Sequence, residues 1–183
     1  MESSRIYFDY NATSLIRPES INSVNKILSS YGNPSSIHKE GRLMRSLIEE
    51  SREKVSKSLS TSSKNIIFTS GGTEAIDIAL NQSPGRLIIN STEHIAVFES
   101  AKRLNIDIDI LDVDSNGLIR MDLLENLLKK GPALVSIMLA NNETGVIQPI
   151  KEISKIVKSY GSLLFCDAVQ AFGKVKLSFD DLG

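Results

Sequence analysis

The sequence predicts an α/β fold of three layers, in which a mainly parallel sheet lies between helices, preceded by an N-terminal helical segment. Three observations support this prediction. Apolar runs alternate with helix-like segments from residue 65 onward, a rhythm that is typical of βαβ units. Several of these runs are apolar at nearly every position, as in parallel strands that are covered on both faces. The first sixty residues show helical patterns and a loop instead.

Five apolar runs are expected to form the strands of the sheet. Glycine or polar residues follow most of them, and such residues mark the turn from a strand into the next element. The expected strands are 65–70 (NIIFTS), 86–91 (RLIINS), 106–113 (IDIDILDV), 133–140 (ALVSIMLA) and 163–168 (LLFCDA).

Helical patterns lie between these runs, near 74–82, 96–104, 121–130 and 150–160. The last pattern has one apolar face and lysines elsewhere, as expected for an amphipathic helix that covers a sheet. The residues of this face are Ile150, Ile153, Ile156 and Val157.

Residues 1–15 are expected to form an N-terminal arm, and residues 16–183 a partial large domain. A helix should start at Pro18, because proline is favoured at the first helical position. The stretch GNPSSIH (32–38) should be a loop. A long amphipathic helix should follow it, and its buried stripe is predicted to consist of Leu43, Leu47, Ile48, Val55 and Leu59.

Composition limits the class of protein. The 183 residues are 41% hydrophobic and 23% charged, which suffices for one core. The net charge of -1 gives no basic excess for nucleic acid and no polybasic run for a membrane. No signal peptide or membrane-spanning run is apparent. The single cysteine, Cys166, excludes an internal disulfide framework and a multi-cysteine metal site. We therefore expect a cytoplasmic protein with no metal, nucleic-acid or membrane partner.

Polar residues follow four of the expected strands. They are Ser70-Gly71-Gly72-Thr73, Thr92-Glu93-His94, Asn141 to Gly145, and Asp167 with Gln170. In open α/β sheets, ligands bind outside the carboxyl ends of the strands. These residues are therefore expected to meet at one edge of the sheet.

Each residue alone also has a structural explanation. The glycines could simply form a turn, and His94 could cap a helix or pack in a core. Asp167 could be an N-cap, and Asn142 could form an Asx turn. Their shared position after strands is what favours a binding site.

A planar, phosphorylated, heteroaromatic cofactor suits this set of groups. Backbone N–H groups at the glycine turn and helix start would bind the phosphate. A carboxylate would keep the ring nitrogen protonated, and an imidazole would stack on the ring, as in pyridoxal 5'-phosphate enzymes. A nicotinamide cofactor fits less well, because no G-x-G-x-x-G follows a strand, and no Walker A sequence is present.

The chain resembles the N-terminal half of a cysteine desulfurase of the NifS/IscS type, a fold-type-I pyridoxal phosphate enzyme of the class V aminotransferase group. Six stretches carry the resemblance in the family's order and spacing, and together they cover nearly the whole chain. They are IYFDYNAT (6–13), GNPSSIH (32–38), IIFTSGGTEA (66–75), TEHIAV (92–97), VSIMLANNETGVIQPI (135–150) and FCDAVQAFGK (165–174).

The resemblance implies a role for each candidate residue. Gly72 and Thr73 would bind the cofactor phosphate, and His94 would stack on the ring and assist proton transfers. Asn142 would lie beside the ring and its 3-oxygen. Asp167 would pair with the ring nitrogen, and Gln170 would hydrogen-bond the 3-oxygen.

The resemblance also implies an activity and partners. The family moves sulfur from L-cysteine to an enzyme cysteine as a persulfide and releases alanine. This sulfur feeds iron–sulfur cluster and thiolated-RNA synthesis, so a scaffold protein would be a partner. Members are homodimers with the active site near the dimer interface.

The sequence departs from the family pattern in two places. After GGTEA the family usually continues with a polar, Asn-containing stretch, whereas this chain has Ile76-Asp77. The family's Ser-x-His-Lys stretch, whose lysine holds the cofactor as a Schiff base, is expected beyond Gly183, as are the sulfur-accepting cysteine and the small domain. Lys174 and Lys176 do not match the position of that lysine.

The prediction is therefore a truncated cysteine desulfurase-like protein that is inactive by itself. A premature stop, a split enzyme and a relic retained as a binding module would each give such a sequence. The alternatives are a non-catalytic scaffold, half of a split enzyme, or a relic of another class V lyase such as a selenocysteine lyase. Cys166 is not expected to accept sulfur, because a buried thiol is inert.

Overall fold

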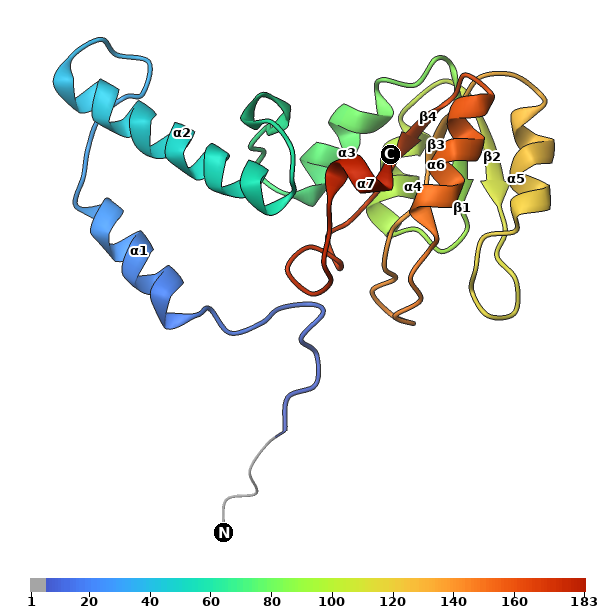
Figure 1. The fold of residues 1–183 in the computed structure, drawn as a ribbon, viewed down its shortest axis with the longest axis horizontal. Coiled ribbons are helices and arrows are strands. Elements are labelled where there is room, and N and C mark those ends of the chain that lie inside the picture. Colours follow the sequence, from blue (N-terminus) through green and yellow to red (C-terminus); the bar gives the residue numbers. More distant parts are fainter. Residues whose placement is uncertain (1–5) are drawn as a thin grey trace. The chain divides into compact units, whose positions relative to one another are not determined.

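The structure is a computed structural model that describes residues 6–183, and Figure 1 shows its elements. The chain divides into two units. The N-terminal unit comprises Met1–Lys57 and Ser62–Ile66, and the sheet unit comprises Ser58–Thr61 and Ile67–Gly183. The predicted division into an arm over 1–15 and a domain over 16–183 stays a prediction, and residues 1–5 of that arm lie outside the described residues.

The sheet unit contains four parallel strands, drawn as arrows in Figure 1. They are β1 (Arg86–Asn90), β2 (Asp107–Leu111), β3 (Leu134–Ser136) and β4 (Leu163–Phe165), in the order β2-β1-β3-β4. The chain passes from β1 outward to β2 and then returns to the other side of β1 to form β3. The strand order therefore reverses between β1 and β3, and this is where open α/β sheets bind ligands.

Helices cover both faces of this sheet. Leu87 and Ile89 of β1 pack in one apolar cluster, together with residues of α3 (Gly72–Leu80) and α4 (Ile95–Lys102). Ile88 packs in the other cluster, with residues of α5 (Met121–Leu128) and α6 (Ile150–Ser159). This alternation follows from the two-residue period of a strand. The predicted three-layer α/β architecture is therefore confirmed, and a short helix, α7 (Phe179–Leu182), follows β4.

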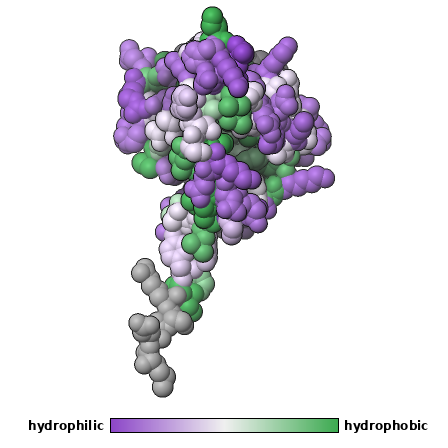
Figure 2. Space-filling model, turned by 90° about the vertical axis from the view of Figure 1, so that its left-hand side faces the viewer, coloured by the Kyte–Doolittle hydropathy of each residue, from purple (hydrophilic) through white to green (hydrophobic). Residues whose placement is uncertain are grey.

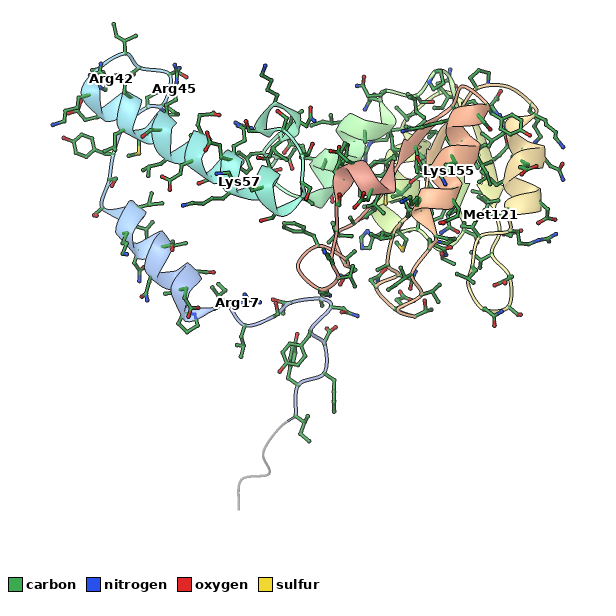
Figure 3. All side chains as sticks on the ribbon, in the orientation of Figure 1. Arg17, Arg42, Arg45, Lys57, Met121 and Lys155 are labelled. Atoms are coloured by element: carbon green, nitrogen blue, oxygen red, sulfur yellow. The ribbon has the colours of Figure 1, made fainter. Side chains whose placement is uncertain are left out.

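The helices follow the predicted patterns closely. On α6, Ile153 and Val157 are fully buried while Lys155 is exposed, and Figure 3 labels this lysine. Met121, also labelled there, begins α5 and packs against the cluster on that face of the sheet. The amphipathic spacing seen in the sequence therefore corresponds to a helix with one face on the sheet.

The expected strand over 65–70 is wrong. Ser63–Asn65 forms a 3-10 turn, and the stretch that follows is extended but joins no strand of the described chain. The side chains of Ile67 and Phe68 are 73% and 50% exposed. An apolar, β-prone run becomes a strand only where a neighbouring strand takes up its backbone hydrogen bonds. No such neighbour exists among residues 6–183, so the described sheet has four strands rather than five.

The other strands are shorter than predicted, but the backbone pairing continues past their ends. The amide of Ile137 donates to the carbonyl of Phe165 at 3.0 Å, and that of Leu139 donates to the carbonyl of Asp167 at 2.8 Å. The segments after β3 and β4 are therefore held side by side up to the residues that were predicted to form a site.

The N-terminal unit contains α1 (Pro18–Leu28), which starts at the predicted proline, and α2 (Lys39–Ser58). The loop 32–38 packs tightly on the start of α2. A Cβ atom at Gly41 would lie 2.4 Å from the carbonyl oxygen of Ser36, so only glycine fits there. Arg45 Nε donates to the carbonyl of Pro34 at 3.0 Å, and Arg42 donates to that of Ile37 (Figure 3).

The predicted buried stripe on α2 is not buried in the described structure. Leu43 and Ile48 are exposed, while Leu47, Val55 and Leu59 are half-buried. No residue of α1 is buried either. Apolar side chains such as Phe8 and Leu15 are also exposed, and Figure 2 shows green surface next to the grey N-terminal residues. The amphipathic pattern is real, but its apolar side is only partly buried.

Within residues 6–183, none of the helices combines the length and the apolar character needed to cross a membrane.

Burial in the core predicts how much an alanine substitution destabilises the fold, and an exposed isoleucine on the neighbouring strand provides the control. Ile89 of β1 is 0% exposed, and its register partner, Ile110 of β2, is 46% exposed. Changing Ile89→Ala should lower the free energy of unfolding by about 2–5 kcal/mol, because it removes a buried side chain and leaves a cavity. Urea unfolding measures this loss. Ile110→Ala is the matched control and should cost less than about 1 kcal/mol; equal costs would contradict the assigned core.

The exposed apolar surface predicts association. A polypeptide limited to residues 1–183 should form oligomers or aggregates, because large exposed apolar patches favour protein contacts. Sedimentation velocity measures the assembly state. Val24→Glu together with Leu28→Lys, at two exposed positions of α1, should reduce association. A monodisperse monomer with a sharp, cooperative melt would contradict this prediction.

Candidate functional site

The glycine turn lies at the start of α3. Gly71 is the N-cap, and no side chain of the described residues caps this helix. No heavy atom lies within 4 Å of a Cβ built on Gly71, so the turn faces open space. Free N–H groups at an uncapped helix start, together with the helix dipole, favour an anion.

Glu74 fixes the position of Ser70, the residue just before the glycine turn. Its carboxylate accepts hydrogen bonds from the amide and the hydroxyl of Ser70, at 2.6 and 2.5 Å. The hydroxyl bond first, and then the amide bond, hold the pKa of Glu74 below its usual range. The carboxylate therefore fixes the residue just before the two glycines and leaves the helix start open. Thr73, predicted to bind phosphate with Gly72, is exposed in the first turn.

His94 is the N-cap of α4, and its Nδ1 accepts a hydrogen bond from the amide of Ala96 at 3.1 Å. The structural explanation of His94 as a helix cap is therefore confirmed. In the neutral ring this bond leaves the proton on Nε2. The side chain is exposed, so the capping bond fixes the imidazole without burying its face.

The loop after β3 is tied to the loop after β1 by Asn141. Its Nδ2 donates to the carbonyl of Thr92 at 3.0 Å, and its Oδ1 accepts from the amides of Glu143 and Thr144. The sequence analysis selected Asn142, which is half-buried beside it. Asn141 forms an Asx turn through these bonds, and the alternative of an Asx turn at Asn142 stays a prediction.

Asp167 and Gln170 follow β4 on a tight turn. The carboxylate of Asp167 accepts from the amide of Val169 at 2.9 Å, a local bond of the kind the structural explanation expected. The oxygen of the Gln170 side chain accepts from the ammonium of Lys174. The turn also lies beside the glycine turn, since a Cβ at Gly72 would be 3.8 Å from a methyl group of Val169.

Cys166 precedes Asp167 and is half-buried. Burial, and then the charges of Glu93 and Asp167, raise its pKa to about 12. The thiol is therefore protonated at neutral pH and a poor nucleophile.

Glu93 is the residue of this edge to which the sequence analysis gave no role. It is 7% exposed and bonds to Ser136, Met138 and Asn90. Burial above all raises its pKa to about 7, and the charge of Asp167 adds to the rise. An acid directly after an apolar strand was the available signal, but nothing in the spacing distinguishes a buried acid from an exposed one.

The carboxyl edge of the sheet thus brings the candidate segments together. Asn141 joins the loop after β3 to the loop that carries His94, and backbone pairing joins Leu139 to Asp167. Val169 adjoins Gly72. That one ligand is bound jointly by these segments stays a prediction for the residues Gly72, Thr73, His94, Asn142, Asp167 and Gln170.

The groups at this edge fit pyridoxal 5'-phosphate. The open helix start suits a phosphate, the carboxylate suits a protonated ring nitrogen, and the exposed imidazole suits a planar ring. A metal centre is a poorer match, because residues 6–183 contain no cluster of three or more His, Cys, Asp or Glu that could hold an ion.

Residues Ser36-Ile37-His38-Lys39 of this chain have the pattern Ser-x-His-Lys. This stretch belongs to the GNPSSIH loop of the N-terminal unit. His38 bonds Glu40 at 3.0 Å, and Lys39 begins α2. In order along the chain it therefore matches the family's GNPSSIH stretch and not the lysine-bearing stretch expected after β4.

Comparison with known proteins identifies a family. The model of the family described as Aminotransferase class-V matches residues 6–183. A curated relative, cysteine desulfurase IscS of Dictyoglomus turgidum, is 43% identical over 189 residues, which cover 97% of this chain and 48% of the relative.

Solved structures agree. A NifS-like protein from Rickettsia africae has a TM-score of 0.92 at 34% identity, covering 97% of this chain and 51% of its own. SspA, in a structure described as a complex with cysteine, has a TM-score of 0.88 at 29% identity, covering 96% and 54%. The chain spans about half the length of the relatives it matches. It therefore belongs to the aminotransferase class-V family and is similar to the cysteine desulfurases of that family over nearly its whole length.

Proposed function

We propose that this chain carries the cofactor-binding part of a cysteine desulfurase and that its carboxyl sheet edge binds pyridoxal 5'-phosphate. One observation above all supports the proposal. The glycine turn, the loop with His94, the loop with Asn142 and the turn with Asp167 adjoin one another where the strand order reverses. The relatives of this chain carry the name cysteine desulfurase.

Each residue contributes a separate interaction to this proposed site. Backbone N–H groups of Gly72 and Thr73 bind the phosphate, helped by the dipole of α3. Asp167 accepts a charge-assisted hydrogen bond from the ring nitrogen, and Gln170 donates through its NH₂ group to the 3-oxygen. Bound in this way, the cofactor supplies an electron sink for bond breaking in an amino acid.

His94 and Asn142 complete the proposed site from the loops after β1 and β3. The capping bond of His94 keeps the orientation of its ring, so the imidazole would be available to stack on a bound cofactor and to hold or release a proton at Nε2. Asn142 would contribute its carboxamide to the same site. The anchor made by Asn141 keeps these two loops at a fixed separation.

L-cysteine is the proposed substrate, with transfer of its sulfur to a cysteine thiol and release of alanine. The relatives are named for this activity, and one solved neighbour is described as a complex with cysteine. Cys166 is not the acceptor, because its raised pKa keeps it protonated. The proposed setting is the cytoplasm, where iron–sulfur assembly would use the sulfur through a scaffold protein.

A partner polypeptide is part of the proposal. The exposed apolar side chains of α1 and α2 favour docking of another polypeptide. This would be a second copy in a homodimer, or a chain that corresponds to the remaining half of these relatives. The lysine that holds the cofactor in the family and the sulfur-accepting cysteine would come with that complement.

Cofactor binding gives the first test of this function. Residues 1–183 should bind pyridoxal phosphate weakly and without a covalent bond. Changing Asp167→Asn keeps an oxygen for the amide of Val169 but removes the charge, so affinity should fall about tenfold. Absorbance and fluorescence titration measure the affinity. Asp180→Asn, at an exposed acid of α7, is the control. Equal affinities for the Asp167 variant and the control would contradict the assignment of Asp167.

Activity gives the second test. A polypeptide limited to residues 1–183 should release neither alanine nor persulfide sulfur from cysteine. No lysine in it stands at the Schiff-base position that the resemblance expects, and its only thiol is poorly nucleophilic. Borohydride reduction with pyridoxal phosphate should label no single lysine. Stoichiometric labelling of Lys174 or Lys176, together with cysteine-dependent alanine release, would overturn this expectation.

A further inference from the structure

The carboxyl group of Glu93 is buried at the point where the sheet reverses its strand order. Its residue is 7% exposed, and it stands between Thr92 and His94 in the loop after β1. His94 beside it is exposed and bonds the amide of Ala96. Glu93 and His94 are thus neighbours in one loop with opposite environments, and only the exposed His94 has a role in the proposed cofactor site.

Three groups bond this carboxyl. Its Oε1 accepts from the backbone amide of Met138 at 2.5 Å and from the side-chain NH₂ group of Asn90 at 3.4 Å. Its Oε2 lies 3.1 Å from the hydroxyl of Ser136. A hydroxyl both donates and accepts. The arrangement therefore satisfies a carboxylic acid whose proton lies on Oε2 as well as it satisfies a carboxylate.

These bonds cross between two strands. Asn90 ends β1 and Ser136 ends β3, and Met138 lies on the segment that continues to Asn141 and Asn142. The two strands are direct neighbours in the sheet. Glu93 therefore connects the loop that carries His94 with the segment that leads to Asn142, and Asn141 connects the same two loops by a separate bond.

The charges around Glu93 oppose its ionisation. The titratable groups that act on it are Asp167 and Cys166 on the segment after β4, and neither supplies a positive charge. No lysine, arginine or histidine forms an ion pair with it among the described residues. A buried carboxylate without a cation is costly, and such a group keeps its proton. Burial accordingly raises the pKa of Glu93 to about 7.

We propose that Glu93 is a positioning residue that locks the His94 loop to the segment after β3 in its neutral, protonated form, so that Asp167 alone presents a negative charge to the cofactor ring. The locking role stands on the geometry of this chain. The role toward the ring rests on the proposed function.

The neutral acid has a defined effect on stability. The pKa of Glu93 is about 7 in the folded chain and 4.5 in an unperturbed carboxyl. Between these values the folded chain holds a proton that the unfolded chain has lost. The folded chain therefore loses stability as pH rises from about 4.5, and the loss levels off above about pH 7.

Glu93→Gln tests the neutral form, because an amide reproduces a protonated acid. Its oxygen accepts from Met138, and its NH₂ group donates to Ser136. The melting temperature of this variant should match that of the unchanged chain near pH 4 and exceed it by several degrees at pH 8, where only the unchanged chain carries the buried charge. Glu152→Gln, at an exposed acid of α6, should show no such pH-dependent gap. A difference in melting temperature between Glu93→Gln and the unchanged chain that does not change with pH would contradict the neutral form of Glu93.

Cys166 supplies a local readout, since it is the only thiol of the chain. The charge of Glu93 contributes to the raised pKa of this thiol. A thiol-reactive reagent should therefore modify Cys166 of the Glu93→Gln variant at the same rate as in the unchanged chain near pH 6, and severalfold faster at pH 9. Glu93→Ala should label faster at both pH values, because the lock is gone. Equal rates for the alanine variant and the unchanged chain would overturn the locking role.

Pyridoxal phosphate separates this proposal from the proposed function. If the unchanged chain binds the cofactor, Glu93→Gln should keep its affinity within about twofold, and Glu93→Ala should weaken it about tenfold because two loops of the site lose their connection. A glutamine variant as weak as the alanine variant would overturn the role toward the ring. If the unchanged chain binds no cofactor, the proposed function and that role fail together, while the melting and labelling results still decide the lock and the neutral form.

Discussion

The pairing of β1 with β3 is the constraint on which the rest of the structure depends. Both strands are covered on both faces, and together they lie where the strand order reverses. Because their side chains alternate between two apolar clusters, a shift of one residue would move each set to the wrong face. The register is thereby fixed, and with it the loops that leave the two carboxyl ends. The positions of His94 and Asn142 are thus consequences of apolar packing several residues away.

The same edge holds two carboxyl groups in different environments. Glu93 is buried, bonds only neutral groups and has a raised pKa, whereas Asp167 is half-buried on a turn beside the glycine-bearing start of α3. Two carboxylates this close would repel each other, and burial decides which of them gives up its charge. In the proposed site, Asp167 is the carboxyl group that would pair with a positively charged group of the cofactor. The neutral form of Glu93 explains why an acid is tolerated inside an otherwise apolar strand junction.

The sequence predicted the layers, the four central strands and every long helix, because periodicity reports which face of an element is buried. It failed at 65–70, where an apolar, β-prone run has no described neighbour, since pairing depends on what lies alongside. It failed on α2 for a related reason, because amphipathicity shows that a stripe needs cover and not what covers it. At the site, it selected Asp167 and His94 from their places after strands. It gave no role to Glu93 or to Asn141, because burial and side-chain bonds arise only in the fold.

The N-terminal unit shows what a lack of apolar burial implies energetically. Both apolar clusters lie wholly in the sheet unit, and α1 has no buried residue. Tight contacts do exist in the N-terminal unit, as between Gly41 and Ser36, but they order a loop and bury little apolar area. Hydrophobic burial is the main favourable term of folding, so this unit has little to offset the entropy of its own ordering. Its helices therefore depend on apolar surface supplied from beyond the N-terminal unit.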